Sequence, residues 1–206
     1  ETPILQPKAG GAIAKPFITH HNALDVDMYL RIAPELYLKR MIVGGFEKVF
    51  ELGRVFRNEG IDQTHSPEFT MMESYEAYTN VEGVIKMVED MCSAVFTDLQ
   101  LSHEISFDGN LKIEFDSDLN HTIKELNTNN IEFSEDSKTI GLLVYDLFER
   151  YVEENIINPT FITDYPVEVS PFARNNKDNP NVTERFELFA FGSELANGFS
   201  ELIDPI

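Results

Sequence analysis

One short stretch of the sequence gathers residue types that are able to bind small charged molecules. The stretch FRNEGIDQTHSPEFTMMESYEAY, residues 56–78, begins with Arg57, continues through a polar loop that contains His65, and ends in a run that carries Glu73 and Tyr75. An arginine pairs well with phosphate or carboxylate groups, and a carboxylate pairs well with an ammonium group. The stretch is therefore either a solvated turn or a binding site, and the rest of the chain must decide which.

Carboxylates also recur on two later segments that have the composition of strands. Side chains at i, i+2 and i+4 lie on one face of a strand. Three segments thus place a carboxylate on the same face as aromatic residues: Glu73 with Phe69 and Tyr75, Glu187 with Phe189 and Phe191, and Glu201 with Phe199. A buried carboxylate without a partner is costly, so these faces are either exposed to water or shaped for a cation. Periodicity leaves both explanations open and at most indicates an acidic, aromatic-lined pocket for a cationic small molecule.

Other residue pairs give weaker signals for metal or phosphate binding. Glu187 and Glu194 fall on adjacent expected strands, where two carboxylates can hold a hard cation such as Mg²⁺. The pair His20-His21 has no Cys or acidic partner at zinc-ligand spacing, which favours a hydrogen-bonding role. Gly10-Gly11 lacks the spacing of the glycine motifs that bind phosphates.

The elements that must position these residues follow from turn residues and hydrophobic periodicity. Residues 1–22 are expected to be irregular, because they contain three prolines and a Gly-Gly pair. The patterns predict strands at 27–32, 48–56, 68–78, 161–166, 184–191 and 194–201, helices at 34–45, 81–99, 119–126 and 141–155, and a hairpin around 108–110. Short loops between strands favour a largely antiparallel sheet, with helices on one side. The predicted fold class is α+β.

Composition limits the possible functions of the chain. Its 206 residues suggest one domain, or one domain with a large insertion. Its formal net charge of -20 should repel phosphate backbones unless a local basic patch or another domain binds them. Residues 101–155 hold thirteen Asp and Glu against four Lys and Arg, which is typical of a solvated face. A single cysteine, Cys92, excludes an intrachain disulfide, and its apolar surroundings indicate a core residue. The chain shows no membrane-length apolar run and no signal peptide, so we expect a cytoplasmic protein.

Longer stretches of the chain resemble a known family. FRNEGIDQTHSPEFTMMESY resembles motif 2 of class II aminoacyl-tRNA synthetases, a strand–loop–strand that binds ATP. The segments KPFITHHNALDVDMYLRIAPELYLKRMIVGGFEKVFELGRVFRNEG, PTFITDYPVEVSPFAR and RFELFAFGSELANGFSEL are similar to bacterial-type lysyl-tRNA synthetases, and the resemblance covers roughly residues 1–100 and 140–205. It implies a partial class II catalytic domain, with motif 2 at about 47–78 and an acidic, variable segment at about 101–140.

The resemblance implies an activity and a set of partners. Members of the family use ATP and Mg²⁺ to convert L-lysine into lysyl-adenylate, and they then transfer the lysine to tRNA(Lys). They are homodimers of the cytoplasm. In such a site no acid or base is required, because the lysine carboxylate attacks the α-phosphorus in line and catalysis consists mainly of positioning and electrostatics.

The resemblance also assigns roles to individual residues. Arg57 would contact the ATP α-phosphate and the lysine carboxylate, and would be the catalytic residue. The remaining ATP-binding residues would be Glu59 and His65 at the adenine and phosphate end, Phe69 stacked on adenine, and Glu187 and Glu194 on Mg²⁺. The remaining lysine-binding residues would be Glu35 and the Gly11 backbone on the α-amino group, Asn197 on the carboxylate, Glu73, Tyr75 and Glu201 on the ε-ammonium group, and Phe199 along the aliphatic stem.

The chain departs from the family pattern in several places. On the family pattern, we expect that motif 1 should already have run before the first residue and that the sequence stops before motif 3 and its γ-phosphate arginine. The anticodon-binding OB domain, expected upstream, is also missing from this sequence. The segment at 114–140 is shorter than expected, and Ile203 stands where Asn is usual. We therefore expect a fragment with weak or no activity. Alternatives are a paralogue that attaches lysine to a translation elongation factor and a non-catalytic lysine-binding protein. An aspartate or asparagine enzyme is disfavoured, because its pocket should be basic, whereas Glu73 and Glu201 make this pocket acidic.

Overall fold

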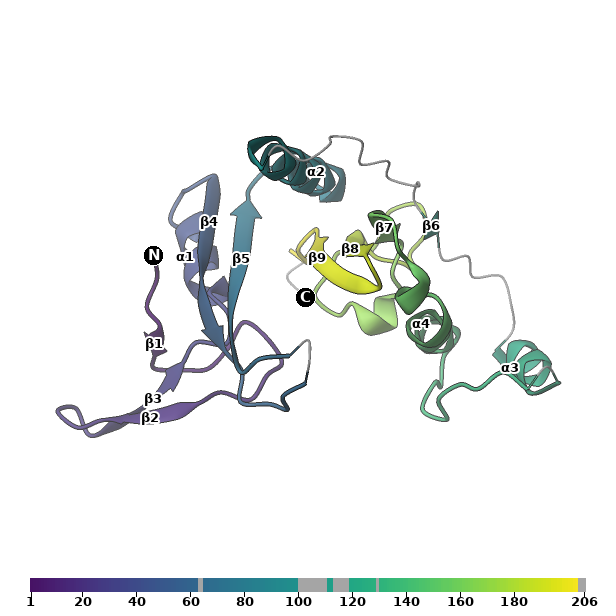
Figure 1. The fold of residues 1–206 in the computed structure, drawn as a ribbon, viewed down its shortest axis with the longest axis horizontal. Coiled ribbons are helices and arrows are strands. Elements are labelled where there is room, and N and C mark those ends of the chain that lie inside the picture. The colour runs from purple at the N-terminus through teal and green to yellow at the C-terminus, as the bar shows by residue number, and fades with distance from the viewer. Residues whose placement is uncertain (63–64, 100–110, 113–118, 129, 204–206) are drawn as a thin grey trace. The chain divides into compact units, whose positions relative to one another are not determined.

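Strands and helices fall into two groups along the chain, as the computed structural model shows (Figure 1). One unit comprises Glu1–Tyr78 and the other comprises Thr79–Ile206. The structure describes residues 1–62, 65–99, 111–112, 119–128 and 130–203. The hairpin predicted around 108–110 lies outside the described residues. The fold class is α+β, as predicted, and within the described residues all strand pairs but one are antiparallel.

The first unit contains two small sheets and a helix. The elements are β1 (Leu5–Gln6), β2 (Ile18–His21), β3 (Val26–Leu30), α1 (Glu35–Val43), β4 (Lys48–Phe56) and β5 (Glu68–Glu76). The first three strands form an antiparallel sheet of order β1-β3-β2, while β4 and β5 form a two-stranded antiparallel sheet. Helix α1 follows Pro34, which suits the start of a helix, and it ends at Gly44 before Gly45 adopts a φ of +99°.

The described residues of the second unit form a four-stranded sheet with helices on both faces. Its elements are α2 (Val81–Asp98), β6 (Leu111–Lys112), α3 (Leu119–Thr128), α4 (Ile140–Tyr151), η1 (Glu153–Asn155), β7 (Thr160–Thr163), η2 (Val167–Val169), β8 (Arg185–Ala190) and β9 (Ser193–Phe199). The sheet order is β6-β7-β8-β9, and β6 runs parallel to β7.

Two apolar clusters hold the helices of the second unit against its sheet. On one face Val88 of α2 packs with Phe186 and Leu188 of β8. On the opposite face Phe148 of α4 packs with Phe189, their ring centroids 5.7 Å apart. Figure 1 shows α2 and α4 on opposite sides of β7–β9. The prediction that helices cover one side was wrong, because successive β8 side chains alternate between two faces, and an aromatic residue on each face packs against a helix.

Most predicted elements are present, with shifted ends. Strand β4 matches its prediction to the residue, and α1, α2, α3, β5 and β8 differ from theirs by a few residues at most. Three predictions need correction. Residues 1–22 are not wholly irregular, since β1 and β2 lie there, the helix predicted at 141–155 is divided at Val152, and the last strand ends at Phe199. The described residues contain no helix that is long and apolar enough to cross a membrane.

Candidate functional site

Arg57 lies immediately after β4, where the chain leaves the hairpin sheet. Its backbone N–H donates to Pro67 O at 2.8 Å, and its Nε approaches Ile32 O at 3.5 Å. Its guanidinium carbon lies 5.2 Å from the centroid of the Phe69 ring, within the range of a cation–π contact. The structure thus brings together Arg57 and Phe69, the two residues expected at the α-phosphate and at the adenine.

Glu59 and His65 lie on the exposed loop between β4 and β5. Glu59 Oε1 accepts from the Lys15 backbone N–H at 3.3 Å, and the neighbouring Asn58 N–H donates to Lys15 O at 2.7 Å. His65 Nδ1 lies 2.8 Å from Asp62 Oδ2. Each of the two predicted ATP-binding side chains therefore has a hydrogen-bond partner, and both side chains remain exposed to solvent.

Glu73 and Tyr75 occupy the inward-facing side of β5. The less exposed positions of this strand begin with Phe69 and Met71 and continue through Glu73, as the alternation predicted. The Tyr75 hydroxyl donates to Glu73 Oε1, whereas Glu73 Oε2 is buried and accepts no hydrogen bond from the described residues. Burial is the main cause that raises the pKa of Glu73, and the charge of Glu35 adds to it. A half-buried carboxylate with an oxygen left over is suited to receiving a cationic donor.

Glu35, the first residue of α1, lies against Gly11. A Cβ built on Gly11 would come within 3.0 Å of Glu35 Cβ and 3.4 Å of Glu35 Oε2, and Gly11 has a φ of +93°. Both observations explain a glycine at this position. The other carboxylate oxygen of Glu35, Oε1, lies 2.5 Å from Lys39 Nζ. The two groups expected at the α-amino group are therefore adjacent, and a lysine of the chain accompanies them.

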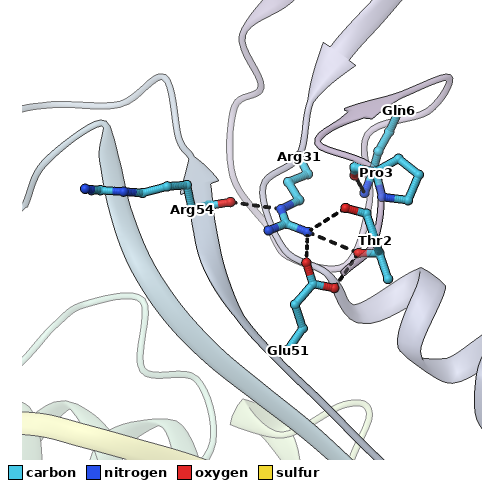
Figure 2. Close-up of polar contacts among 6 residues, drawn as sticks. All are labelled: Thr2, Pro3, Gln6, Arg31, Glu51 and Arg54. Atoms are coloured by element: carbon cyan, nitrogen blue, oxygen red, sulfur yellow. Dashed lines mark hydrogen bonds and ion pairs between the residues drawn. The ribbon is translucent and has the colours of Figure 1, made fainter.

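A buried ion pair supports this part of the first unit (Figure 2). Arg31, at the end of β3, pairs with Glu51 of β4, and both side chains are at most 5% exposed. Arg31 also donates through Nε to Arg54 O at 2.8 Å and through Nη1 to Thr2 Oγ1 at 3.1 Å, while Thr2 Oγ1 donates to Glu51 Oε2 at 2.6 Å. The Phe56 N–H donates to Arg31 O at 2.9 Å. The cluster thus fixes the last residues of β4, directly before Arg57.

The hydrogen bonds of this cluster keep Glu51 charged. Desolvation alone would raise the pKa of Glu51, but the hydrogen bonds from Thr2 and Arg31 outweigh it and lower the pKa below its ordinary value. Gly53 makes room for the arginine, because a Cβ there would lie 2.5 Å from Arg31 Nη2. Sequence reasoning missed both Arg31 and Glu51. The available signals were a glutamate between valines on one face of β4, and a glycine two residues later on that face.

In the second unit Glu187 is enclosed by its own partners. The residue is 4% exposed. Its Oε2 accepts from the Tyr165 hydroxyl at 2.7 Å, and its Oε1 accepts from Arg185 and from Asn197 Nδ2, the latter at 3.3 Å. The Arg185 guanidinium carbon lies 4.7 Å from the Tyr165 ring centroid. Desolvation, together with the charge of Glu187, raises the pKa of Tyr165, so its hydroxyl stays a donor.

Glu194 joins the same face of the sheet through an irregularity in β9. Glu187 pairs with Asn197 and Phe189 pairs with Glu194, while Leu195 has no register partner. Opposed residues of an antiparallel pair share a face, so the extra residue brings Glu194 to the face of Glu187. Regular alternation from 194 to 201 would have put Glu194 and Asn197 on opposite faces.

The electrostatics of Glu194 show that the two glutamates interact. The residue is open to solvent at the strand, but desolvation of its carboxyl group raises its pKa, and the charge of Glu187 raises it further. Arg185 and a hydrogen bond from Asn197 act in the opposite direction. A divalent cation would relieve the repulsion between the two carboxylates. The residues thus fit such a cation, with the exposed Glu194 as the more accessible ligand.

Other predicted site residues and metal candidates were also located. Phe199, at the end of β9, pairs with Arg185, and Glu201 lies beyond the strand in an isolated bridge with Ala173. His20 hydrogen bonds to Asp27 at 3.1 Å, in line with the hydrogen-bonding role expected for it. Within the described ranges, no group of three or more His, Cys, Asp or Glu side chains is placed to hold a metal ion.

Comparison with known proteins gave a consistent result along the whole chain. The family described as tRNA synthetases class II (D, K and N) matches residues 1–206. Among curated proteins, the chain is 49% identical over 230 residues to a lysine–tRNA ligase of Prochlorococcus marinus subsp. pastoris. It is 50% identical over 229 residues to one of Helicobacter hepaticus and 46% identical over 227 residues to one of Helicobacter pylori. Each comparison covers 100% of the chain.

The relatives are considerably longer than the chain. The chain spans 45% of the Prochlorococcus ligase, 44% of the Helicobacter hepaticus ligase and 45% of the Helicobacter pylori ligase. The similarity therefore concerns a little under half of each of these proteins.

Proposed function

Since the chain belongs to the class II tRNA synthetases for aspartate, lysine and asparagine, we propose that it is the lysine-activating part of a lysine–tRNA ligase. The observation that carries this proposal is the identity of 46–50% to curated lysine–tRNA ligases along the whole chain. The ligase would join L-lysine to ATP as lysyl-adenylate and pass the lysyl group to tRNA(Lys). The acidic character of the Glu35 and Glu73 region supports lysine over aspartate and asparagine as the substrate.

In the first unit, Glu35, Glu73 and Arg57 carry charges opposite to those of the lysine groups that they would bind. The ε-ammonium group of lysine is a suitable partner for Glu73 and Tyr75, because Glu73 has a buried oxygen that no described group occupies. The α-amino group is suited to Glu35 Oε2, beside Gly11. Arg57 would stabilise the charge that develops as the lysine carboxylate attacks the α-phosphorus of ATP and pyrophosphate leaves.

The proposal assigns further residues to ATP. Phe69 offers an aromatic ring for the adenine, and Glu59 and His65 remain predicted ligands of ATP. Glu187 and Glu194 would hold Mg²⁺, which neutralises phosphate charge when it is bound. Tyr165, Arg185 and Asn197 orient the Glu187 carboxylate through hydrogen bonds. Asn197, Phe199 and Glu201 remain predicted lysine ligands.

The acceptor and the assembly are also part of the proposal. The similar curated proteins are lysine–tRNA ligases, which favours tRNA over a translation factor as the acceptor. On the family resemblance we further infer a homodimer that acts in the cytoplasm. A non-catalytic lysine-binding protein is less well supported, because such a protein would not need Arg57, Glu187 and Glu194 together.

Replacement of Glu73 by glutamine tests the proposed lysine site. In the protein that contains this chain, Glu73→Gln should weaken lysine binding by about 10- to 100-fold, the cost of losing one charge-assisted hydrogen bond. ATP binding should change little. Isothermal titration with each ligand measures both effects, and Glu68→Gln, on the exposed side of the same strand, serves as the matched control. Unchanged lysine affinity in Glu73→Gln would refute the assignment.

A further inference from the structure

Lys39 lies among the carboxylates of the proposed lysine site. It stands on α1, one turn after Glu35, and its Nζ lies 2.5 Å from Glu35 Oε1. The side chains of Lys39 and Glu35 are 30% and 23% exposed. The same Nζ lies 5.5 Å from the centroid of the Tyr75 ring on β5. A cation of the chain is thus in contact with Glu35 and also with Tyr75, the hydrogen-bond partner of Glu73.

The contact with Lys39 makes the two oxygens of Glu35 different. Oε1 is engaged by the ammonium group of Lys39, while Oε2 is the oxygen on the side of Gly11. Because Gly11 has no side chain, a ligand is able to approach the peptide there. The ion pair therefore sets the rotation of the carboxylate so that Oε2 is presented beside the Gly11 backbone.

Lys39 also balances the charges of this region. Burial and the charge of Glu35 raise the pKa of Glu73, while Lys39 and Arg57 lower it. Without Lys39, the carboxylates of Glu35 and Glu73 would repel each other with less compensation. The lysine therefore offsets part of the repulsion between these two carboxylates.

An ordinary surface pair is the competing explanation. Glu and Lys at i and i+4 on a helix commonly form exposed ion pairs of about 0.3–0.5 kcal/mol. The chain contains such a pair on α2, where Lys86 Nζ lies 2.5 Å from Asp90 Oδ1 and both side chains are 65% exposed. The pair on α1 differs in being half-buried, in contacting a second element and in adjoining Gly11.

We propose that Lys39 is a positioning residue of the lysine site, which holds Glu35 so that its Oε2 accepts the α-amino group of the substrate. The inference rests on the proposed function and deepens it. Lys39 does not itself touch the reacting atoms. Its effect is transmitted through the carboxylate of Glu35 and is therefore specific for ligands that carry an α-amino group.

A pair of ligands tests this role in the protein that contains this chain. L-Lysine carries both amino groups, whereas 6-aminohexanoate is the same molecule without the α-amino group. In Lys39→Met the dissociation constant for lysine should rise about tenfold, because an unfixed carboxylate binds less well. The inhibition constant of 6-aminohexanoate should change less than about twofold, and Lys39→Arg should retain most of the lysine affinity.

Two controls separate this role from general damage. Lys86→Met removes the lysine of the exposed pair on α2 and should leave both constants unchanged. In a Glu35→Gln background, Lys39→Met should have no further effect on lysine binding, because the Glu35 carboxylate through which Lys39 acts is no longer present. Lys39→Gln, which is polar and similar in length, repeats the test if the methionine variant folds poorly.

The outcomes distinguish this inference from the proposed function. Equal weakening of lysine and 6-aminohexanoate would overturn the inference, because Lys39 would then act at the ε-ammonium end or on the fold. Unchanged binding of both ligands would show that Lys39 and Glu35 form only an ordinary surface ion pair, and it would also overturn the inference. If the unmodified protein bound no lysine, the proposed function would fail and the inference would fail with it.

Discussion

At the scale of single residues, Glu73 combines a cost to the fold with a proposed role in binding. Its carboxyl group is desolvated on β5, and burial is the main cause of its raised pKa. The hydrogen bond from Tyr75 and the charges of Lys39 and Arg57 compensate only in part. A desolvated carboxyl group keeps its proton up to a higher pH than an exposed glutamate does. A bound cation then stabilises the charged carboxylate.

This cost should be measurable as a dependence of stability on pH. The folded-state pKa of Glu73 lies above the ordinary value of 4.5, so its contribution to stability is present below pH 4.5 and is lost as the pH rises through the raised pKa. In Glu73→Gln this loss is absent. The free energy of unfolding of the variant relative to the original protein should therefore be higher at pH 8 than at pH 5.

Urea unfolding at the two pH values measures the difference, and Glu68→Gln is the control on the exposed side of β5. A relative stability of Glu73→Gln that fell between pH 5 and pH 8 would show that the carboxylate is stabilised in the fold. In that case the view of Glu73 as a desolvated group awaiting a cation would be wrong.

The sequence predicted only some of these residue-scale features. Alternation placed Glu73 and Tyr75 on one face with Phe69, and β5 has that arrangement. The pair Glu35 and Lys39 could have been read from helical spacing in PELYLK, but its contact with Tyr75 could not, because it depends on how α1 packs against β5. Likewise, the hydrogen bond from Tyr165 to Glu187 joins positions 22 residues apart in sequence, and neither turn residues nor periodicity indicates it.

At the scale of elements, β4 buries a charged side chain and exposes two large apolar ones. Its Phe50 and Leu52 are 73% and 65% exposed, whereas Glu51 is buried between them. Hydrophobicity alone would have buried the other face. The reversal is possible because Arg31 and Thr2 supply the donors that a buried carboxylate requires, and Gly53 leaves space for the guanidinium.

Breaking this buried pair should destabilise the protein strongly. We predict that Arg31→Met lowers the free energy of unfolding by about 3–5 kcal/mol, because Glu51 would be left buried without its cation. The double variant Arg31→Met, Glu51→Leu should recover a large part of the loss. Chemical denaturation at pH 7 measures both variants, and Arg54→Met, which truncates an arginine 57% exposed on the same strand, is the control.

The pH dependence adds a second check on the pair. The lowered pKa of Glu51 stabilises the fold above pH 4.5, and this stabilisation is lost as the pH falls through the lowered pKa. In Arg31→Met the carboxyl group should protonate more readily, so the destabilisation should be smaller at pH 5 than at pH 7. A double variant as unstable as Arg31→Met would contradict this account and would assign the cost to lost packing instead.

Element prediction succeeded where the local sequence pattern was strong. β4 and β5 are long strands rich in β-branched and aromatic residues and are separated by turn formers, so their bounds were predicted closely. β1 has only two residues and β2 is exposed throughout, so neither offers an alternating pattern. The irregularity at Leu195 also escaped prediction, since a bulge depends on pairing with β8.

At the scale of the whole molecule, charge and family membership give complementary information. The formal net charge of -20 argues against general affinity for nucleic acid, whereas family membership points to an enzyme class. The sequence predicted one mainly antiparallel sheet, whereas the described strands form three. Composition and periodicity could not reveal this division, because it depends on which strand edges hydrogen bond to each other. The long resemblance, and not periodicity, identified the class II family.

The central claim, that this chain activates lysine, is tested most directly by amino-acid-dependent exchange between ATP and labelled pyrophosphate. The protein that contains this chain should be supplied in turn with lysine, arginine, ornithine, aspartate and asparagine. The account predicts exchange with lysine far above the other four, because Glu35 and Glu73 would receive the two amino groups of lysine, whereas ornithine is one methylene shorter and arginine ends in a guanidinium group. Exchange that depended on aspartate or asparagine, or no exchange with lysine, would contradict it.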